Sequence, residues 1–87
     1  MLSLPDATRV LRAAGESTRL RLLALCALRE WSVTELAASI GQSEPRVSRH
    51  LKVLCEAGLL RRARRGQWVC YAAATEGDVA FLVSTLL

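Results

Sequence analysis

Residues 41–54, GQSEPRVSRHLKVL, restrict the fold more than any other segment, because two kinds of side chain recur along them at helical spacing. Successive residues of an α-helix advance by about 100°, so the apolar residues of this segment share one face: Val47, Leu51 and Leu54. The basic residues fall on the far side: Arg46, Arg49 and Lys52. The segment therefore predicts a helix with one face for a hydrophobic core and another for an anionic partner.

A second short helix is expected just before this one. In WSVTELAASIG, residues 31–41, apolar side chains recur at helical spacing: Leu36, Ala37 and Ile40. Either Ser32 or Thr34 can cap this helix at its N-terminus. Gly41 permits the positive φ of a sharp turn, after which Ser43 caps the next helix. Two helices joined in this way predict a helix-turn-helix, about residues 33–57, whose second helix lies in a DNA major groove.

Two further helices are expected before this unit. The first, about residues 5–14, places Leu11 and Ala14 toward the core and closes at Gly15. The second begins at a cap, Ser17 or Thr18, and continues to residue 30. Its expected core residues recur at helical spacing: Leu20, Leu23, Ala24, Ala27 and Leu28. A composition with 52% hydrophobic and 5% aromatic residues suits a compact helical core of this kind.

After Gly58 the sequence no longer shows the helical spacing of apolar residues. Residues 59–65 and 67–73 are β-type runs joined through Gly66, so they predict a two-stranded hairpin, about residues 59–73. Four arginines flank its tip: Arg61, Arg62, Arg64 and Arg65. A basic hairpin that follows a recognition helix is placed to contact the phosphate backbone. The expected fold class is mainly α with a small β-hairpin, a winged helix-turn-helix of about five helices plus a two-stranded wing.

Positive charge is concentrated in the same region. The chain carries a net charge of +4, but between Arg46 and Arg65 there are seven basic residues and one acid, a net charge of +6, which leaves −2 for the remainder. This distribution is typical of a surface that binds a polyanion. The alternative is a solvated arginine-rich face that binds nothing.

The last segment, TEGDVAFLVSTLL, predicts an amphipathic closing helix, about residues 77–87. Its apolar side chains are spaced at i, i+3, i+4 and i+7: Val79, Leu82, Val83 and Leu86. A chain of 87 residues buries a limited fraction of its surface, so a symmetric partner is a natural cover for this face. We expect a homodimer whose interface combines these four residues with Leu4 and Leu11, and the alternative is packing on the chain's own first helix.

The run SEPRVSRHLKVLCEAGLL, followed by an arginine-rich wing and GQWVCY, resembles the winged helix-turn-helix of the ArsR family of bacterial transcriptional repressors, over roughly residues 11–73. This resemblance implies a homodimer that binds an inverted repeat in double-stranded DNA and releases it when an effector binds. It also implies a set of DNA-binding residues in the second half of the helix-turn-helix and in the wing: Gln42, Ser43, Arg46, Ser48, Arg49, His50, Lys52, Arg61, Arg62, Arg64, Arg65 and Gln67. For His50, a local hydrogen bond within the protein is the alternative.

The effector is where the sequence departs from the family. Members that sense arsenic or cadmium carry a Cys-x-Cys, and the matching positions here are Ser32 and Thr34, which cannot act as thiolate ligands. Members with a zinc site on the final helix use Asp and His there, and this segment has Asp78 and no histidine. The three cysteines, Cys26, Cys55 and Cys70, have no CxxC pair and are expected to be reduced. We expect no metal and no cofactor, and the effector stays open.

Other classes of protein are disfavoured by the same residues. One histidine and scattered carboxylates do not form the acid, base or nucleophile pairs of an enzyme. No apolar run approaches the roughly 20 residues that span a bilayer, and no secretory signal is visible, so we expect a cytoplasmic protein. The remaining alternative to a repressor is an N-terminal interaction module of a longer chain, for example one with an S-adenosylmethionine-dependent methyltransferase domain.

Overall fold

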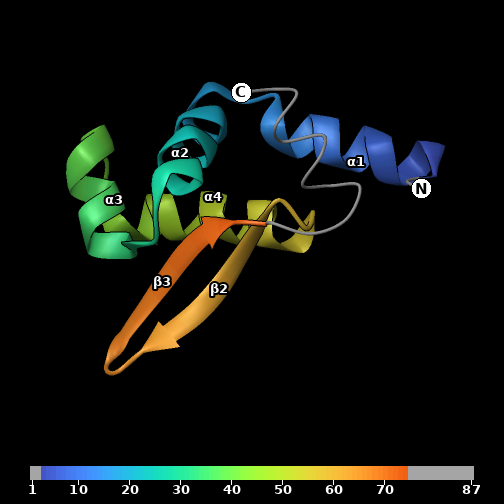
Figure 1. Ribbon diagram of the computed structural model, residues 1–87. Helices are drawn as coiled ribbons and strands as arrows, with labels where there is room; N and C mark the ends of the chain where they lie inside the picture. The colour runs from blue at the N-terminus through green and yellow to red at the C-terminus, as the bar shows by residue number, and fades with distance from the viewer. Residues whose placement is uncertain (1–2, 75–87) are drawn as a thin grey trace.

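The computed structural model describes residues 3–74 (Figure 1). The elements of this part follow one another in the order α1 (Leu4–Ala14), α2 (Ser17–Leu28), β1 (Trp31–Ser32), α3 (Val33–Ile40), α4 (Glu44–Glu56), β2 (Leu60–Arg65) and β3 (Trp68–Ala73). The described part is thus mostly helical with a small antiparallel hairpin, as expected. It contains four helices, and the expected closing helix, about 77–87, lies outside the described residues together with Val79, Leu82, Val83 and Leu86.

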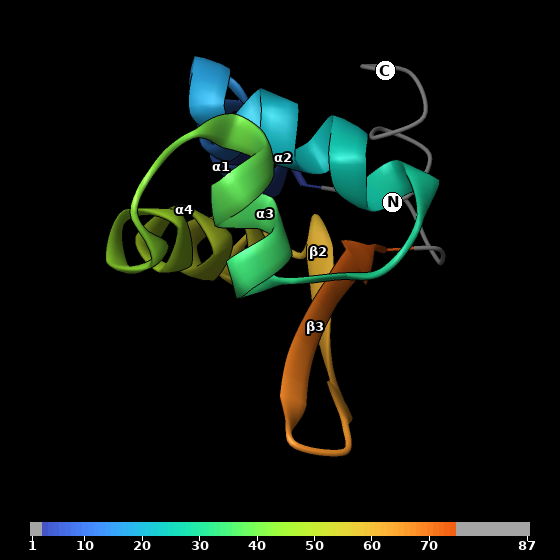
Figure 2. The ribbon, with the colours of Figure 1, turned by 90° about the vertical axis from the view of Figure 1, so that its left-hand side faces the viewer.

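The helices pack around one core, and the hairpin projects from it. Figures 1 and 2 both show β2 and β3 extending beyond the helices on one side, with α4 passing close to their base. The largest fully buried side chains come from all four helices and from the start of the hairpin: Val10, Leu22, Leu23, Leu36, Val47, Leu51, Leu54 and Leu59. Because α4 contributes Val47, Leu51 and Leu54 to this core, its opposite face is directed outward.

Among residues 3–74 the sheet has three strands, in the order β1-β3-β2, where the sequence predicted two. Both pairs are antiparallel, and β1 pairs Trp31 with Tyr71 and Ser32 with Cys70. A strand of two residues carries no periodicity, so the sequence does not reveal it. The pairing matters for the site because Ser32 is also the N-cap of α3, so β3 is tied directly to the helix-turn-helix.

The core face of α2 differs from the expected one. Leu22, Leu23 and Cys26 are buried together with Thr18, whereas Leu20, Ala24, Ala27 and Leu28 are exposed. Apolar residues occur on every side of this helix, so their spacing alone does not select one face. The helix also ends at Leu28 rather than at residue 30, and its N-cap is Glu16 rather than Ser17 or Thr18. In α1, Leu11 is 49% exposed, so the expectation that it points into the core is wrong, whereas Ala14 is buried.

The turn between α3 and α4 has the expected chemistry. Gly41 adopts φ of 70°, the left-handed region, and its N–H donates to the carbonyl of Ala37. Ser43 caps α4, with Pro45 in the first turn, where its missing N–H removes no helical hydrogen bond. Within residues 3–74 no helix is both long and apolar enough to cross a bilayer.

Candidate nucleic-acid interface

The start of α4 is fixed by its own side chains. The Ser43 hydroxyl accepts a hydrogen bond from the N–H of Arg46 at 3.3 Å, so one of the free amides of the helix end is satisfied within the protein. Glu44 lies in the same first turn and places a carboxylate beside the positive end of the helix dipole. A phosphate at this end would therefore meet a negative charge, and the arginines further along the helix are the stronger anion ligands.

The outward face of α4 carries three basic side chains, Arg46, Arg49 and Lys52. Arg46, Ser48, Arg49 and Lys52 are exposed, while Val47, Leu51 and Leu54 are completely buried. The helix therefore holds its cations at fixed angles, since its inner face is locked in the core. Guanidinium groups on a rigid helix are suited to the paired acceptors of guanine and to phosphate oxygens.

Other residues of the expected DNA-binding set also contact the protein itself: Arg65 pairs with Glu30, and Gln42 and His50 contact the start of α2. Gln42 donates from Nε2 to the hydroxyl of Thr18 at 3.1 Å, and its Oε1 is buried. His50 is partly buried, with Nδ1 3.8 Å from Oε2 of Glu16. Both contacts join the helix-turn-helix to the start of α2, so these two side chains orient the unit on the core. The separation of 3.8 Å is longer than a hydrogen bond, so the role of His50 in DNA binding stays a prediction.

Glu16, the residue that His50 approaches, is also the N-cap of α2. Its carboxylate accepts a hydrogen bond from the N–H of Arg19 at 3.0 Å, which lowers the pKa of Glu16 from its usual value, and His50 lowers it further. The carboxylate is therefore ionised at neutral pH, where it also serves as the N-cap of α2. Neither Glu16 nor Thr18 stood out in the sequence as a contact of α4 or of the turn before it, since both look like ordinary helix-start residues.

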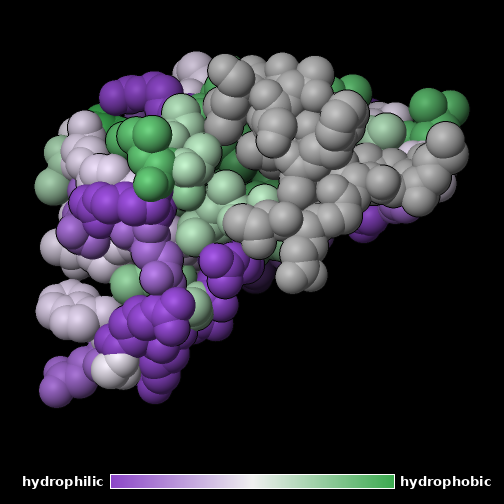
Figure 3. Space-filling view, in the orientation of Figure 1, coloured by the Kyte–Doolittle hydropathy of each residue, from purple (hydrophilic) through white to green (hydrophobic). Residues whose placement is uncertain are grey.

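The wing supplies the second group of cations. All four of its arginines are exposed: Arg61, Arg62, Arg64 and Arg65. Gln67 is exposed beside them, and Trp68 is 61% exposed next to the turn at Gly66. Figure 3 shows hydrophilic residues covering the projecting hairpin at the lower left. Helix face and wing together form a basic surface on the described part of the chain.

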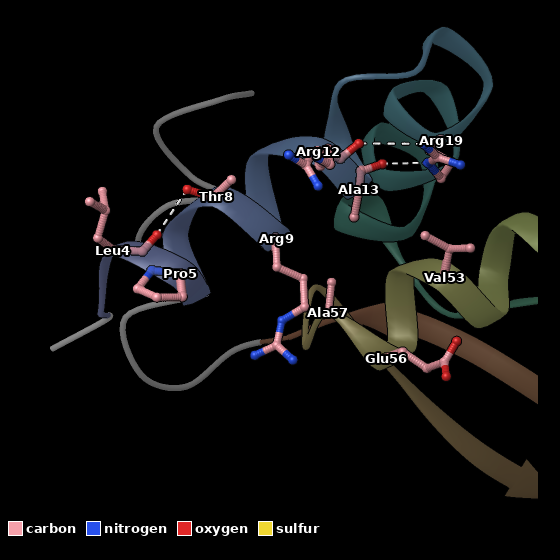
Figure 4. A pocket seen from close by; sticks show the side chains of 10 residues that line it. All are labelled: Leu4, Pro5, Thr8, Arg9, Arg12, Ala13, Arg19, Val53, Glu56 and Ala57. Atoms are coloured by element: carbon pink, nitrogen blue, oxygen red, sulfur yellow. Dashed lines mark hydrogen bonds between the residues drawn. The ribbon is translucent and has the colours of Figure 1, made fainter.

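A groove of about 900 Å³ lies between α1 and the C-terminal end of α4 (Figure 4). Leu4, Ala13, Val53 and Ala57 form much of its lining, and Arg19 crosses it, donating to the carbonyl of Ala13. Leu4, which the sequence placed in a dimer interface, is 81% exposed at the groove's edge. This groove lies at the opposite end of α4 from Arg46, so it is separate from the basic surface formed by the helix face and the wing.

Residues 16–62, more than half of the chain, match the family described as bacterial regulatory protein, arsR family. The chain belongs to the ArsR family. The arsenic resistance transcriptional regulator ArsR1 of Pseudomonas putida is 43% identical over 63 residues, which are 71% of this chain and 49% of that protein. The arsenical resistance operon repressor of Escherichia coli is 39% identical over 64 residues, 72% of this chain and 55% of that protein. The chain thus spans about half the length of these relatives.

A solved structure supports the same membership. The homodimeric winged helix-turn-helix DNA-binding domain of a possible ArsR-family transcriptional regulator from Mycobacterium bovis superposes with a TM-score of 0.86 at 31% identity. The likeness covers 95% of this chain and 76% of that one. The winged-helix fold expected from the sequence is confirmed by it.

Cys26 and Cys55 of this ArsR-family chain pack with the hydrophobic core. Cys26 is 2% exposed, and burial raises the pKa of its thiol to about 12, while burial also raises that of Cys55. Ser32, at a position of the Cys-x-Cys in arsenic-sensing members, is buried and accepts a hydrogen bond from the N–H of Glu35. Within residues 3–74 no three side chains of the His, Cys, Asp and Glu types come together as a metal site would require.

Proposed function

We propose that this ArsR-family chain is a dimeric, sequence-specific DNA-binding transcriptional regulator that represses its target genes. The observation that carries the proposal is the division of α4 into two faces. Val47, Leu51 and Leu54 fix the helix in the core, and the exposed Arg46 and Arg49 face away from it. A surface helix has no structural need for this row of cations, whereas a helix in a major groove does.

The proposed contact set follows this geometry. The helix contributes Ser43, Arg46, Ser48, Arg49 and Lys52, and the wing contributes Arg61, Arg62, Arg64 and Gln67. Arg46 and Arg49 are assigned to base edges, since guanidinium groups pair with guanine in two places at once. The wing arginines are assigned to phosphates. Gln42 and His50 are assigned to positioning because their side chains contact Thr18 and Glu16.

Dimerisation is part of the proposal because a palindromic site needs two recognition helices. Leu4 and Leu11 are exposed on α1, and the Mycobacterium bovis domain of the same fold is described as homodimeric. The residues 79, 82, 83 and 86, which the sequence also placed in the interface, stay a prediction. Such a regulator acts in the bacterial cytoplasm, where its DNA lies.

Arsenic sensing does not transfer from the named relatives to this chain. Ser32 and Thr34 supply no thiolate, and the hydroxyl of Ser32 already caps α3. An N-terminal module of a longer regulatory protein, including a methyltransferase fusion, is compatible with the same DNA-binding surface.

The experiment that tests the proposal is selection from a randomised duplex library with the purified protein at near-physiological salt. The expected product is an inverted repeat with half-sites about one helical turn apart. Selection by a variant with Arg46 and Arg49 both changed to Ala is the matched control, and it should yield no repeat. If both proteins retained unrelated sequences, the protein would bind DNA through its charge alone, with no preference for a sequence.

A further inference from the structure

The four wing arginines do not share one face of the hairpin. Side chains alternate along a strand, and cross-strand partners share a face. The register puts Arg65 (paired with Trp68), Ala63 (with Cys70) and Arg61 (with Ala72) on one face, and Arg64 (with Val69) and Arg62 (with Tyr71) on the other. Two separate hollows agree with this placement of the arginines: one is lined by Arg65, Trp68, Cys70 and residues 32, 34 and 35, the other by Arg62, Ala63, Arg64 and Val69.

Arg65 pairs with an acid of the short link between α2 and β1. Its Nε lies 3.1 Å from Oε1 and 3.2 Å from Oε2 of Glu30, so the guanidinium faces the whole carboxylate. The two residues are 35 positions apart in sequence. Arg65 is the last residue of β2 before the turn at Gly66, so this ion pair acts near the outer end of the wing.

Glu30 is a fixed point because the residues on both sides of it are tied down. Trp31 donates from Nε1 to the carbonyl of Leu25 at 2.7 Å and pairs with Tyr71 in the sheet. The guanidinium of Arg29 lies 3.5 Å from the centre of the Trp31 ring. The carboxylate that receives Arg65 therefore moves with α2 and α3, not with the wing.

We infer that Arg65 is a positioning residue rather than a DNA contact: the Glu30–Arg65 ion pair holds the wing at the angle from which Arg64 reaches the phosphate backbone. The carboxylate neutralises the one wing cation that it holds, and the other three wing arginines, Arg61, Arg62 and Arg64, keep their charge for DNA. The β1–β3 pairing fixes the middle of β3, and this ion pair fixes the outer end of its partner strand. The inference rests on the proposed function, since it assigns different tasks within the same basic surface.

The test compares single variants by the salt dependence of their affinity, measured with both the selected repeat and a scrambled duplex. Each phosphate contact contributes about 0.9 to the slope of log affinity against log salt. R64Q should lower the slope by about 1 on both duplexes. R65Q should leave the salt slope as in the unmodified protein. It should weaken binding to the repeat several-fold more than binding to the scrambled duplex, because the wing keeps its phosphate-binding arginines but is no longer held at a fixed position on the DNA.

E30Q is the second arm of the test. It frees Arg65 for phosphate contact, so the slope on the scrambled duplex should rise by about 1, and the preference for the repeat should fall. All three side chains are at least partly exposed, so the variants should fold, which far-UV circular dichroism checks.

Two results would overturn the inference. One is an R65Q slope that falls by about 1, as that of R64Q does, which would make Arg65 an ordinary phosphate contact. The other is an E30Q slope that does not change. Failure of the proposed function has a different signature, namely no preference of the unmodified protein for any duplex.

Discussion

Ser32 and Glu35 exchange hydrogen bonds across the first turn of α3. The N–H of Glu35 donates to the Ser32 hydroxyl at 3.2 Å, and the N–H of Ser32 donates to Oε1 of Glu35 at 2.9 Å. Because Ser32 also pairs with Cys70 in the sheet, this capping box lies where the wing meets the helix-turn-helix. The same pair of residues therefore stabilises a helix end and links the two halves of the candidate interface.

Ser32→Ala should lower the free energy of unfolding by about 1 kcal/mol, because the N–H of Glu35 loses its partner in a buried place. Urea unfolding followed by circular dichroism measures the change. Ser48→Ala is the matched control, since Ser48 is exposed on α4 and caps nothing. Equal stability of the S32A and S48A proteins would contradict the assigned role of the capping box.

The Glu35 carboxylate should make stability depend on pH in acid. The hydrogen bond from the Ser32 N–H holds the pKa of Glu35 below its ordinary value, so its contribution is fully present above the unfolded pKa of about 4.5 and is lost as the pH falls through the folded pKa. Glu35→Gln should be less stable than the unmodified protein at pH 7, and the difference should shrink below about pH 4.5. Urea unfolding of both proteins across this range checks the prediction, and a constant difference would refute it.

Arg49→Ala should weaken binding to the selected repeat by about 1 to 3 kcal/mol and binding to a scrambled duplex by less, if Arg49 reads a base edge. Fluorescence anisotropy with the two labelled duplexes measures both losses. Arg9→Ala serves as the control, because Arg9 lies on α1, where it pairs with Asp6 at 2.7 Å, and not on the basic surface. Equal losses on the two duplexes would make Arg49 a phosphate contact.

Cys26 should resist thiol reagents in the folded protein. Its side chain is 2% exposed, and its pKa is raised to about 12 by burial, so almost no thiolate forms at pH 8. Titration with a chromogenic disulfide should leave this thiol unreacted until denaturant is added, and peptide mapping identifies it. Rapid labelling of Cys26 without denaturant would mean that the α2 core opens readily.

Local patterns predict the recognition helix well. Its cap at Ser43, its buried stripe from Val47 to Leu54 and its exposed cations all depend on residues within a few positions of one another, and all of these features are present. The turn at Gly41 is of the same kind. Helical periodicity alone therefore separates the core positions of α4 from its surface positions.

Contacts between distant segments could not be predicted in this way. Thr18 meets Gln42 across 24 residues, and Glu30 meets Arg65 across 35, so no periodicity marks either pair. The sequence accordingly placed Gln42 and Arg65 with the predicted DNA contacts, because no nearby residue marks Thr18 or Glu30 as their partners. The core face of α2 was misassigned for another reason: leucines and alanines occur around the whole helix, and only its neighbours decide which are buried.

The central claim is that the outer face of α4 and the wing recognise a particular DNA sequence. The most direct measurement is the ratio of the affinities of the unmodified protein for the selected repeat and for a scrambled duplex of the same composition, at near-physiological salt. We predict a ratio of about 10³ or more, as for other specific regulators. A ratio near one would contradict the account, because the basic surface would then bind DNA by charge alone.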